Sequence, residues 1–223
     1  MSTTKDRVVK EVINNVISSK FLRDIAVKKM DKMLQKNIVD NTAIPALPAE
    51  KKQRYAYLSS IMHQVKRNLD KGYISAEVTR KMVDVFTDGG QMNTDRRKKL
   101  NPVKEAYKEK YGDFPPQFCV LSPTKACNLN CLGCYATSDQ HSTPKLEFDI
   151  ARKVVEDVHD TFGSRFMTIS GGEPFMYKSQ GKTMWDIWEE FNDMFFLVYT
   201  NATLMNDEVA RRLAKLGNVT PCI

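Results

Sequence analysis

The chain has 223 residues, of which 42% are hydrophobic and 27% charged, and its formal net charge is +7. This composition is ordinary for a globular protein, and the densest apolar run, Phe195–Tyr199, is far shorter than the roughly 20 residues of a membrane-spanning helix. The start of the chain is polar and contains an acidic residue, which argues against a signal peptide, so we expect a cytoplasmic protein. Three of the five cysteines lie inside eight residues, which argues against a disulfide framework and favours metal or redox chemistry.

The charge is unevenly distributed along the chain. Residues 1–117 hold 24 Lys and Arg against 14 Asp and Glu, a net of +10, whereas residues 118–223 hold 10 against 13, a net of −3. A basic front half can favour a nucleic acid, an acidic partner or an anionic membrane surface. Because these cations are interspersed with acids, we interpret them as a solvated helical surface, and no firm nucleic-acid partner is predicted.

Residues 1–90 are predicted to form a helical region. Apolar residues recur at spacings of three and four from Val8 to Met33, and we expect this stripe to be buried against neighbouring helices. Prolines 45 and 48 interrupt the pattern. Two further helices are expected, over about residues 50–69 and 75–86.

A polar, charged connector is predicted over residues 91–116, and its Gly- and Pro-containing end, 111–116, marks the expected domain boundary. From residue 117 to 223, short apolar strands alternate with amphipathic helices, which is typical of βαβ units with a parallel sheet. In such sheets ligands bind beyond the carboxyl ends of the strands. The expected strands are 118–122, 166–170, 194–200 and 219–223, and the expected helices are 146–162, 184–191 and one from Asn206 to Gly217.

Three cysteines follow the first of these strands with spacings that suit a metal centre. Cys127, Cys131 and Cys134 are separated by three and two residues, so their thiolates can converge on one site. Soft thiolates favour iron–sulfur clusters or zinc over hard cations. Three ligands suit a [4Fe–4S] cluster in which one iron stays open for another ligand.

Two other interpretations of the cysteines stay open on spacing alone. A structural zinc site needs four protein ligands, and Cys119, Cys222 or His141 would have to supply the fourth. A redox-active thiol pair, Cys131 and Cys134, is the second alternative, although it leaves Cys127 unexplained.

Three motifs together resemble those of radical S-adenosylmethionine (radical SAM) enzymes. Cys127-x3-Cys131-x2-Cys134 resembles the signature of that family, and Ser170-Gly-Gly-Glu-Pro174 resembles its Gly-Gly-Glu-Pro motif. Thr200-Asn-Ala-Thr203 is similar to the Thr-Asn-Gly-Thr segment of members that modify peptides and small metabolites, with Ala202 where glycine is usual. The motifs follow three successive strands in the family's order, and the resemblance covers about residues 117–223.

The resemblance implies a fold and a set of cofactors. The fold class would be α/β, a partial (βα) TIM-like radical SAM barrel with about three and a half βα units, preceded by the all-helical region. Because the family's core has six such units, we expect a fragment truncated in its fourth strand, able to bind a cluster but not to catalyse efficiently. The implied cofactors are a [4Fe–4S] cluster and S-adenosyl-L-methionine (SAM).

The resemblance also implies residue roles. The cluster would be held by Cys127, Cys131 and Cys134, and no catalytic residue can be assigned beyond it. Gly133 stands where an aromatic residue is common, which puts stacking of a side chain on the adenine in doubt. Residues implied to contact SAM are Gly133, Tyr135, Ser170, Gly171, Gly172, Glu173, Thr200 and Asn201; for Thr200 and Asn201, capping of the strand end is an equal alternative.

The implied reaction is reductive cleavage of SAM to a 5′-deoxyadenosyl radical that abstracts hydrogen from an unknown substrate, either a peptide or a small metabolite. An electron donor such as ferredoxin or flavodoxin is therefore an expected partner. The alternative from another functional class is a zinc-stabilised, non-catalytic binding module with a basic helical arm.

Overall fold

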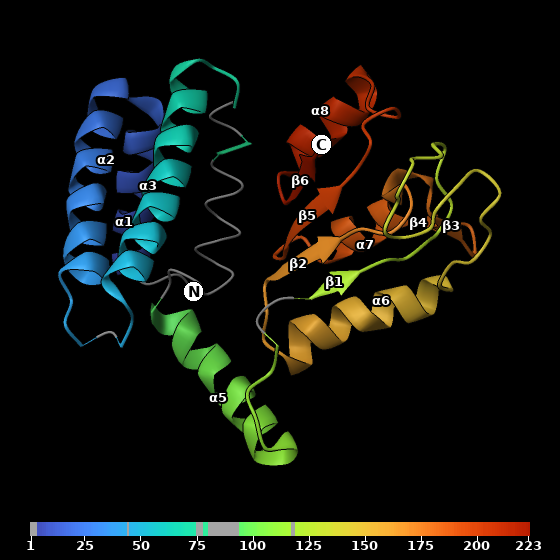
Figure 1. Ribbon diagram of the computed structural model, residues 1–223, viewed down its shortest axis with the longest axis horizontal. Helices are drawn as coiled ribbons and strands as arrows, with labels where there is room; N and C mark the ends of the chain where they lie inside the picture. The colour runs from blue at the N-terminus through green and yellow to red at the C-terminus, as the bar shows by residue number, and fades with distance from the viewer. Residues whose placement is uncertain (1–3, 44, 75–77, 80–93, 117–118) are drawn as a thin grey trace. The chain divides into compact units, whose positions relative to one another are not determined.

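The computed structural model describes residues 4–43, 45–74, 78–79, 94–116 and 119–223 (Figure 1). The chain divides into two compact units, residues 1–80 and 81–223. This division comes earlier in the chain than the boundary expected at residues 111–116. The helix expected over about 75–86 lies outside the described residues, apart from a helical stretch at 78–79.

The first unit is helical over its described residues, as predicted. Ser19 begins the second helix by accepting a hydrogen bond from the backbone N–H of Leu22 at 3.4 Å, and Pro48 occupies the first position of the third, where its missing N–H costs nothing. The elements of this first unit are α1 (Thr4–Ser18), α2 (Lys20–Leu34), the π-helical turn η1 (Gln35–Val39) and α3 (Pro48–Asp70).

Polar contacts join α2 to α3. Arg23 pairs with Asp70 at 2.8 Å, and the Asp31 carboxylate accepts hydrogen bonds from Tyr55 at 2.9 Å and Ser59 at 2.6 Å. The expected burial of the apolar stripe is wrong for part of α2, because its polar side faces α3. The exposed side chains of that stripe are Phe21, Ile25, Met30 and Met33, with exposed fractions of 47 to 71%.

Part of the expected connector is a helix, α5 (Thr94–Tyr111). Its described residues are rich in Lys and Glu, which favour helix without giving an apolar stripe, so the hydrophobic pattern alone does not reveal it. Tyr107 packs edge-on against Phe162 with ring centroids 5.4 Å apart, which joins α5 to the rest of the second unit.

A parallel four-stranded sheet forms the centre of the second unit, in the order β1–β2–β5–β6. Thr168 pairs in register with Val120 on one side and Leu197 on the other. Because the spatial order follows the chain and parallel crossovers are right-handed, the three crossover helices cover the same face. The strands are β1 (Val120–Leu121), β2 (Phe166–Ile169), β5 (Phe195–Tyr199) and β6 (Val219–Cys222); the helices are α6 (Phe148–Glu156), α7 (Met184–Glu190) and α8 (Asp207–Leu216).

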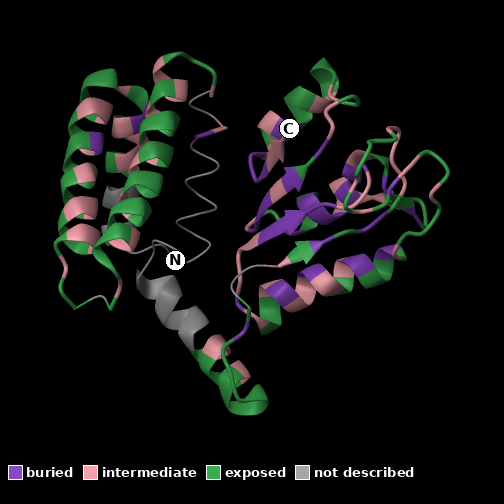
Figure 2. Ribbon diagram, in the orientation of Figure 1, coloured by how far each residue is buried: buried purple, intermediate pink, exposed green. Residues whose placement is uncertain are grey.

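The core lies between the sheet and these helices, and Figure 2 shows the buried residues concentrated there. Ile169, Phe196 and Val198 are fully buried, together with Trp188 of α7. Alternate strand residues reach this core, so the opposite set is left for the other face. The α/β class with a helical region before it, and the three and a half βα units, are therefore confirmed.

Two details differ from the expected elements. The helix after β1 ends in a π-helical turn, η2 (Asp157–Thr161), and a small hairpin precedes α7, with strands β3 (Lys178–Ser179) and β4 (Lys182–Thr183). Gln180 and Gly181 form its turn with φ of 52° and 75°, a pair of left-handed residues that suits a two-residue hairpin. No described helix has the length and apolar character needed to cross a membrane.

Candidate cluster and cofactor site

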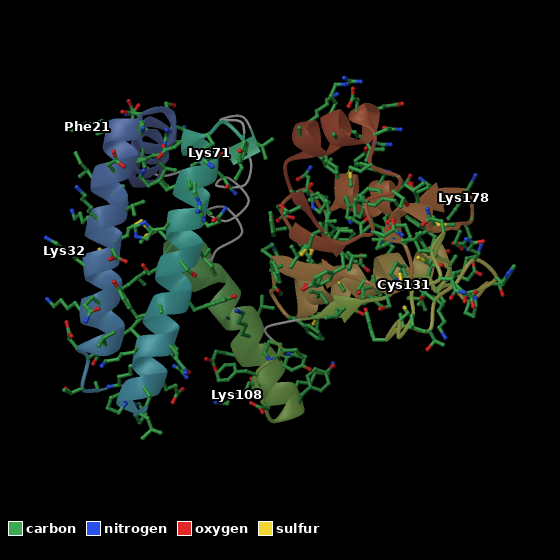
Figure 3. The ribbon with its side chains drawn as sticks, turned by 45° about the horizontal axis from the view of Figure 1, so that its top comes forward. Phe21, Lys32, Lys71, Lys108, Cys131 and Lys178 are labelled. Atoms are coloured by element: carbon green, nitrogen blue, oxygen red, sulfur yellow. The ribbon has the colours of Figure 1, made fainter. Side chains whose placement is uncertain are left out.

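The loop that follows β1, residues 122–147, carries the three cysteines and is called the cysteine loop below. Backbone hydrogen bonds close its base, from Leu146 to Pro123 and from Lys125 to Pro144, both at 2.8 Å. Further along, the N–H of Cys127 donates to the carbonyl of Asp139 at 3.1 Å. Backbone hydrogen bonds therefore fold the loop on itself; Cys131, labelled in Figure 3, lies within it.

The three thiols have different surroundings. Backbone N–H groups of Ser138 and Ala136 donate to the Cys134 sulfur and lower the pKa of that thiol, which favours the thiolate that a metal requires. The Cys127 sulfur lies 3.6 Å from the side-chain nitrogen of Asn201. Cys131 is exposed and free.

The Gly-Gly-Glu segment after β2 packs against the backbone of the cysteine loop. Gly172 donates to the carbonyl of Thr124 at 2.7 Å, and Glu173 donates to that of Ala126 at 2.9 Å. A Cβ on Gly172 would lie 2.2 Å from the Ala126 oxygen, and one on Gly171 would lie 2.7 Å from the Thr124 oxygen. The sequence interpretation assigns these glycines to close approach of a ligand; in the structure, what approaches them is the loop that holds the cysteines.

Glu173 is buried, with 1% of its surface exposed, and its carboxylate joins the second motif to the third. Its oxygens accept from the Thr200 hydroxyl at 2.9 Å, from the N–H of Asn201 at 2.9 Å and from the N–H of Phe175 at 3.1 Å. These three donors leave about one of the four lone-pair positions of a carboxylate for an ammonium group. These hydrogen bonds hold Thr200 and the backbone of Asn201 against Glu173 at the end of β5.

A ring of side-chain hydrogen bonds joins the first motif to the third. Asn201 Nδ2 donates to Asn128 Oδ1 at 2.9 Å, Asn128 Nδ2 donates to Thr203 Oγ1 at 2.6 Å, and Thr203 Oγ1 donates to Asn201 Oδ1 at 2.6 Å. We call these three residues the Asn clasp. The sequence interpretation chose Asn201 but missed Asn128 and Thr203, although both lie within the quoted motifs.

The remaining predicted cofactor residues lie around these contacts. The hydroxyls of Tyr135 and Ser170 are hydrogen-bonded to each other, which joins the cysteine loop to the end of β2, although Tyr135 is 78% exposed. Gly133 is exposed with φ of 76°. Ala202 stands where the motif usually has glycine, and its φ of 60° lies in the left-handed region that glycine favours. The substitution of alanine for glycine therefore leaves the backbone angle in the same region.

Of the three candidate fourth ligands of a zinc site, His141 lies in the cysteine loop, whereas Cys119 and Cys222 lie outside it. Cys119 precedes β1 at the amino end of the sheet, where burial raises the pKa of its thiol, and Cys222 ends β6, at the opposite edge of the sheet from β1. In the described part of the chain, no three His, Cys, Asp or Glu side chains come together as ligands of a single metal ion.

The donor set suits an iron–sulfur cluster, in which each thiolate binds a different iron. Three thiols of one closed loop are present, one of them with a lowered pKa. Ser138, whose backbone N–H donates to the Cys134 sulfur, also has a buried hydroxyl. That hydroxyl has no hydrogen-bond partner within the described residues. Such an orphaned donor fits a polar group bound beside the loop.

Part of the chain is similar to known proteins. The family described as the Radical SAM superfamily matches residues 121–223. Fe-coproporphyrin III synthase of Methanosarcina barkeri is 31% identical over 99 residues, which is 44% of this chain and 24% of that protein. An uncharacterised protein of Methanocaldococcus jannaschii is 26% identical over 103 residues, 44% of this chain and 34% of its own length. The chain thus spans about a quarter to a third of these curated relatives.

Two solved structures are also similar. SuiB of Streptococcus suis bound to SAM matches 53% of this chain and 27% of its own, at 22% identity and a TM-score of 0.41. SuiB bound to the precursor peptide SuiA matches 90% and 35%, at 17% identity and the same TM-score of 0.41. Residues 121–223, which hold the three motifs at one edge of a parallel sheet, thus match the Radical SAM superfamily, whose members use a [4Fe–4S] cluster and SAM.

Proposed function

We propose that this chain is the cluster-bearing part of a radical SAM enzyme. Cys127, Cys131 and Cys134 would hold one [4Fe–4S] cluster, and SAM would bind its open iron through the amino and carboxylate groups of the methionine part. The observation that carries this proposal is the joining of the three motifs by hydrogen bonds at the carboxyl edge of the sheet. Ligands of parallel sheets bind at that edge.

The protein's own residues would hold and orient SAM. Glu173 has about one acceptor position left for the methionine ammonium, and the backbone of Ser170, Gly171 and Gly172 lies beside it. Gly133 and Tyr135, both exposed, are available for the adenine. Thr200 and Asn201 would act chiefly by fixing these loops, since their hydrogen bonds are made within the protein.

When bound, the two cofactors would supply a one-electron reduction of the sulfonium that breaks a carbon–sulfur bond and yields a 5′-deoxyadenosyl radical able to take hydrogen from a substrate. Cluster potentials range from roughly −700 to +450 mV, and this reduction needs the low end. We therefore propose a low-potential donor such as ferredoxin or flavodoxin and a reducing compartment, the cytoplasm. The substrate class, peptide or small metabolite, rests on the Thr200–Thr203 segment alone.

Anaerobic reconstitution with iron and sulfide tests the proposal. We expect about four irons and four acid-labile sulfides per chain, with a brown colour, and loss of all three when Cys127, Cys131 and Cys134 are changed together to Ala. Changing Cys119 and Cys222 together to Ala is the matched control, and it should leave the iron content unchanged.

The alternative functions give different results. One zinc without sulfide would contradict the proposal and support a zinc-stabilised binding module. Activity as a thiol oxidoreductase that survives Cys127→Ser and is lost with Cys134→Ser would support the redox pair instead.

A further inference from the structure

Asn201 is the described residue whose side chain reaches a predicted cluster ligand with an N–H group. Its Nδ2 lies 3.6 Å from the Cys127 sulfur, within hydrogen-bond range for sulfur. The other thiol with N–H donors, Cys134, receives them from backbone. A side-chain donor can be removed by substitution whereas a backbone donor cannot, so Asn201 is the point at which the surroundings of these sulfurs can be altered.

The orientation of the Asn201 amide follows from its neighbours. The backbone N–H of Thr203 can only donate, and it lies 3.0 Å from one atom of the amide, which must therefore be the oxygen Oδ1. The nitrogen Nδ2 is then the atom that faces Asn128 and Cys127. The backbone N–H of Thr203 thus fixes the amide orientation in which Nδ2 donates toward the Cys127 sulfur.

The donor is also held in place from its backbone. The N–H of Asn201 donates to the buried carboxylate of Glu173 at 2.9 Å, while its side chain belongs to the Asn clasp. Because both the backbone and the side chain of Asn201 are held by protein groups, the N–H would stay directed at the sulfur in the loaded protein.

We propose that the Asn201 side chain raises the reduction potential of the cluster by donating an N–H···S hydrogen bond to its ligand Cys127. Reduction adds negative charge to the cluster and its sulfurs, and a donor to a ligand sulfur stabilises that charge; hydrogen bonds to sulfur are among the features that set such potentials. This role rests on the proposed function, and it makes Asn201 a positioning and tuning residue rather than a catalytic one.

The test is a redox titration of the reconstituted full chain, followed by electron paramagnetic resonance and carried out without SAM. Asn201→Leu removes the donor at similar side-chain size. We expect the one-electron equilibrium constant for reduction to fall about tenfold, equivalent to a potential lower by about 59 mV. After exchange into D2O, the electron–nuclear coupling of the Asn201 deuteron should be present in the parent and absent in the variant.

Thr203→Val is the matched control. It removes the hydroxyl contacts of the same clasp but has no contact with Cys127 among the described hydrogen bonds, so the equilibrium constant should change less than twofold. Asn201→Ala is the second variant, and it should reproduce the shift if the larger Leu side chain prevents loading.

Three results would overturn the proposal. The first is a fully loaded Asn201→Leu or Asn201→Ala protein with an unchanged potential. The second is failure of both variants to load while Thr203→Val loads, since Asn201 would then act only in building the loop. In either case the parent would still carry four irons, whereas a parent without a cluster would contradict the proposed function and this inference with it.

Discussion

At the scale of single residues, Gly172 is the position with the least room. The Ala126 oxygen lies 2.2 Å from where its Cβ would be, so any side chain must push the cysteine loop away from β2. The hydrogen bonds of Gly172 and Glu173 to that loop would be strained by the same movement. Glycine at this position therefore allows the cysteine loop to pack against the end of β2.

We expect Gly172→Ala to reduce the iron bound after reconstitution and to lower the free energy of unfolding by about 1–3 kcal/mol, the usual cost of overpacking. Iron analysis and denaturant unfolding of the metal-free protein measure the two effects. Gly181→Ala is the control: its φ of 75° also strains alanine, but nothing lies within 4 Å of the new Cβ, so the iron content should stay as in the parent. Equal iron loss in both variants would contradict this account.

Ala202 is a strained residue beside the site. Its φ of 60° is in the left-handed region, which costs a non-glycine residue about 1–2 kcal/mol, whereas glycine loses about 0.5–1 kcal/mol through its freedom in the unfolded chain. We expect Ala202→Gly to raise the free energy of unfolding by about 0.5–1 kcal/mol, measured by denaturant titration. A loss of stability would show that the Ala202 methyl group makes packing contacts worth more than the strain.

At the scale of elements, the amino ends of the strands carry a charged cluster that is separate from the site. His159 of η2 lies 3.0 Å from Asp193 and contacts Asp160, and Arg165 pairs with Asp193 at 3.1 Å. Burial works to lower the pKa of His159, but the hydrogen bonds to Asp193 and Asp160 outweigh it, so the pKa is raised above 6.5. In βα folds this end of the sheet serves stability.

The raised pKa gives a pH dependence with a definite sign. Protonated His159 stabilises the fold fully below pH 6.5, its reference value in the unfolded chain, and this stabilisation is lost as the pH rises through its folded pKa. We expect the free energy of unfolding to decrease over that range, and His159→Gln to remove this decrease. His141→Gln, at an exposed loop position, is the control. An unchanged pH profile in His159→Gln would contradict the assignment.

The elements of the second unit could largely be predicted from the sequence because each has a local signal. Asn206 caps α8 by accepting from the N–H of Val209 at 2.9 Å, and Gly217 ends it with φ of 71°, both as predicted. The β3–β4 hairpin has two-residue strands, too short for an alternating pattern. Helix α5 gives no apolar stripe. Both were therefore missed.

Part of the candidate site could likewise be predicted from the sequence, and part could not. Cys127, Cys131 and Cys134 could be chosen from spacing, but the partners of Glu173 could not, because a carboxylate beside two glycines looks equally suited to a ligand or to a neighbouring loop. Only the fold shows that its oxygens face Thr200 and Asn201. The Asn clasp was missed for the same reason, since Asn128 and Thr203 are 75 residues apart in sequence.

At the scale of the whole molecule, the two units differ in kind. The first is a set of helices joined by ion pairs and side-chain hydrogen bonds, with Ile17 and Val27 as the apolar side chains that are buried in its described part. The second has a continuous core under a parallel sheet and holds all the residues proposed for the cofactors. The proposed chemistry therefore lies within residues 121–223, the part that matches the superfamily.

The central claim is that three cysteines hold a [4Fe–4S] cluster and leave its fourth iron without a cysteine ligand. The most direct measurement is the electron paramagnetic resonance spectrum of the reduced, reconstituted protein with and without SAM. We expect a [4Fe–4S] signal whose g values shift when SAM is added, because SAM binds the iron that has no cysteine ligand. A cluster signal that SAM leaves unchanged, or no cluster signal at all, would contradict the account.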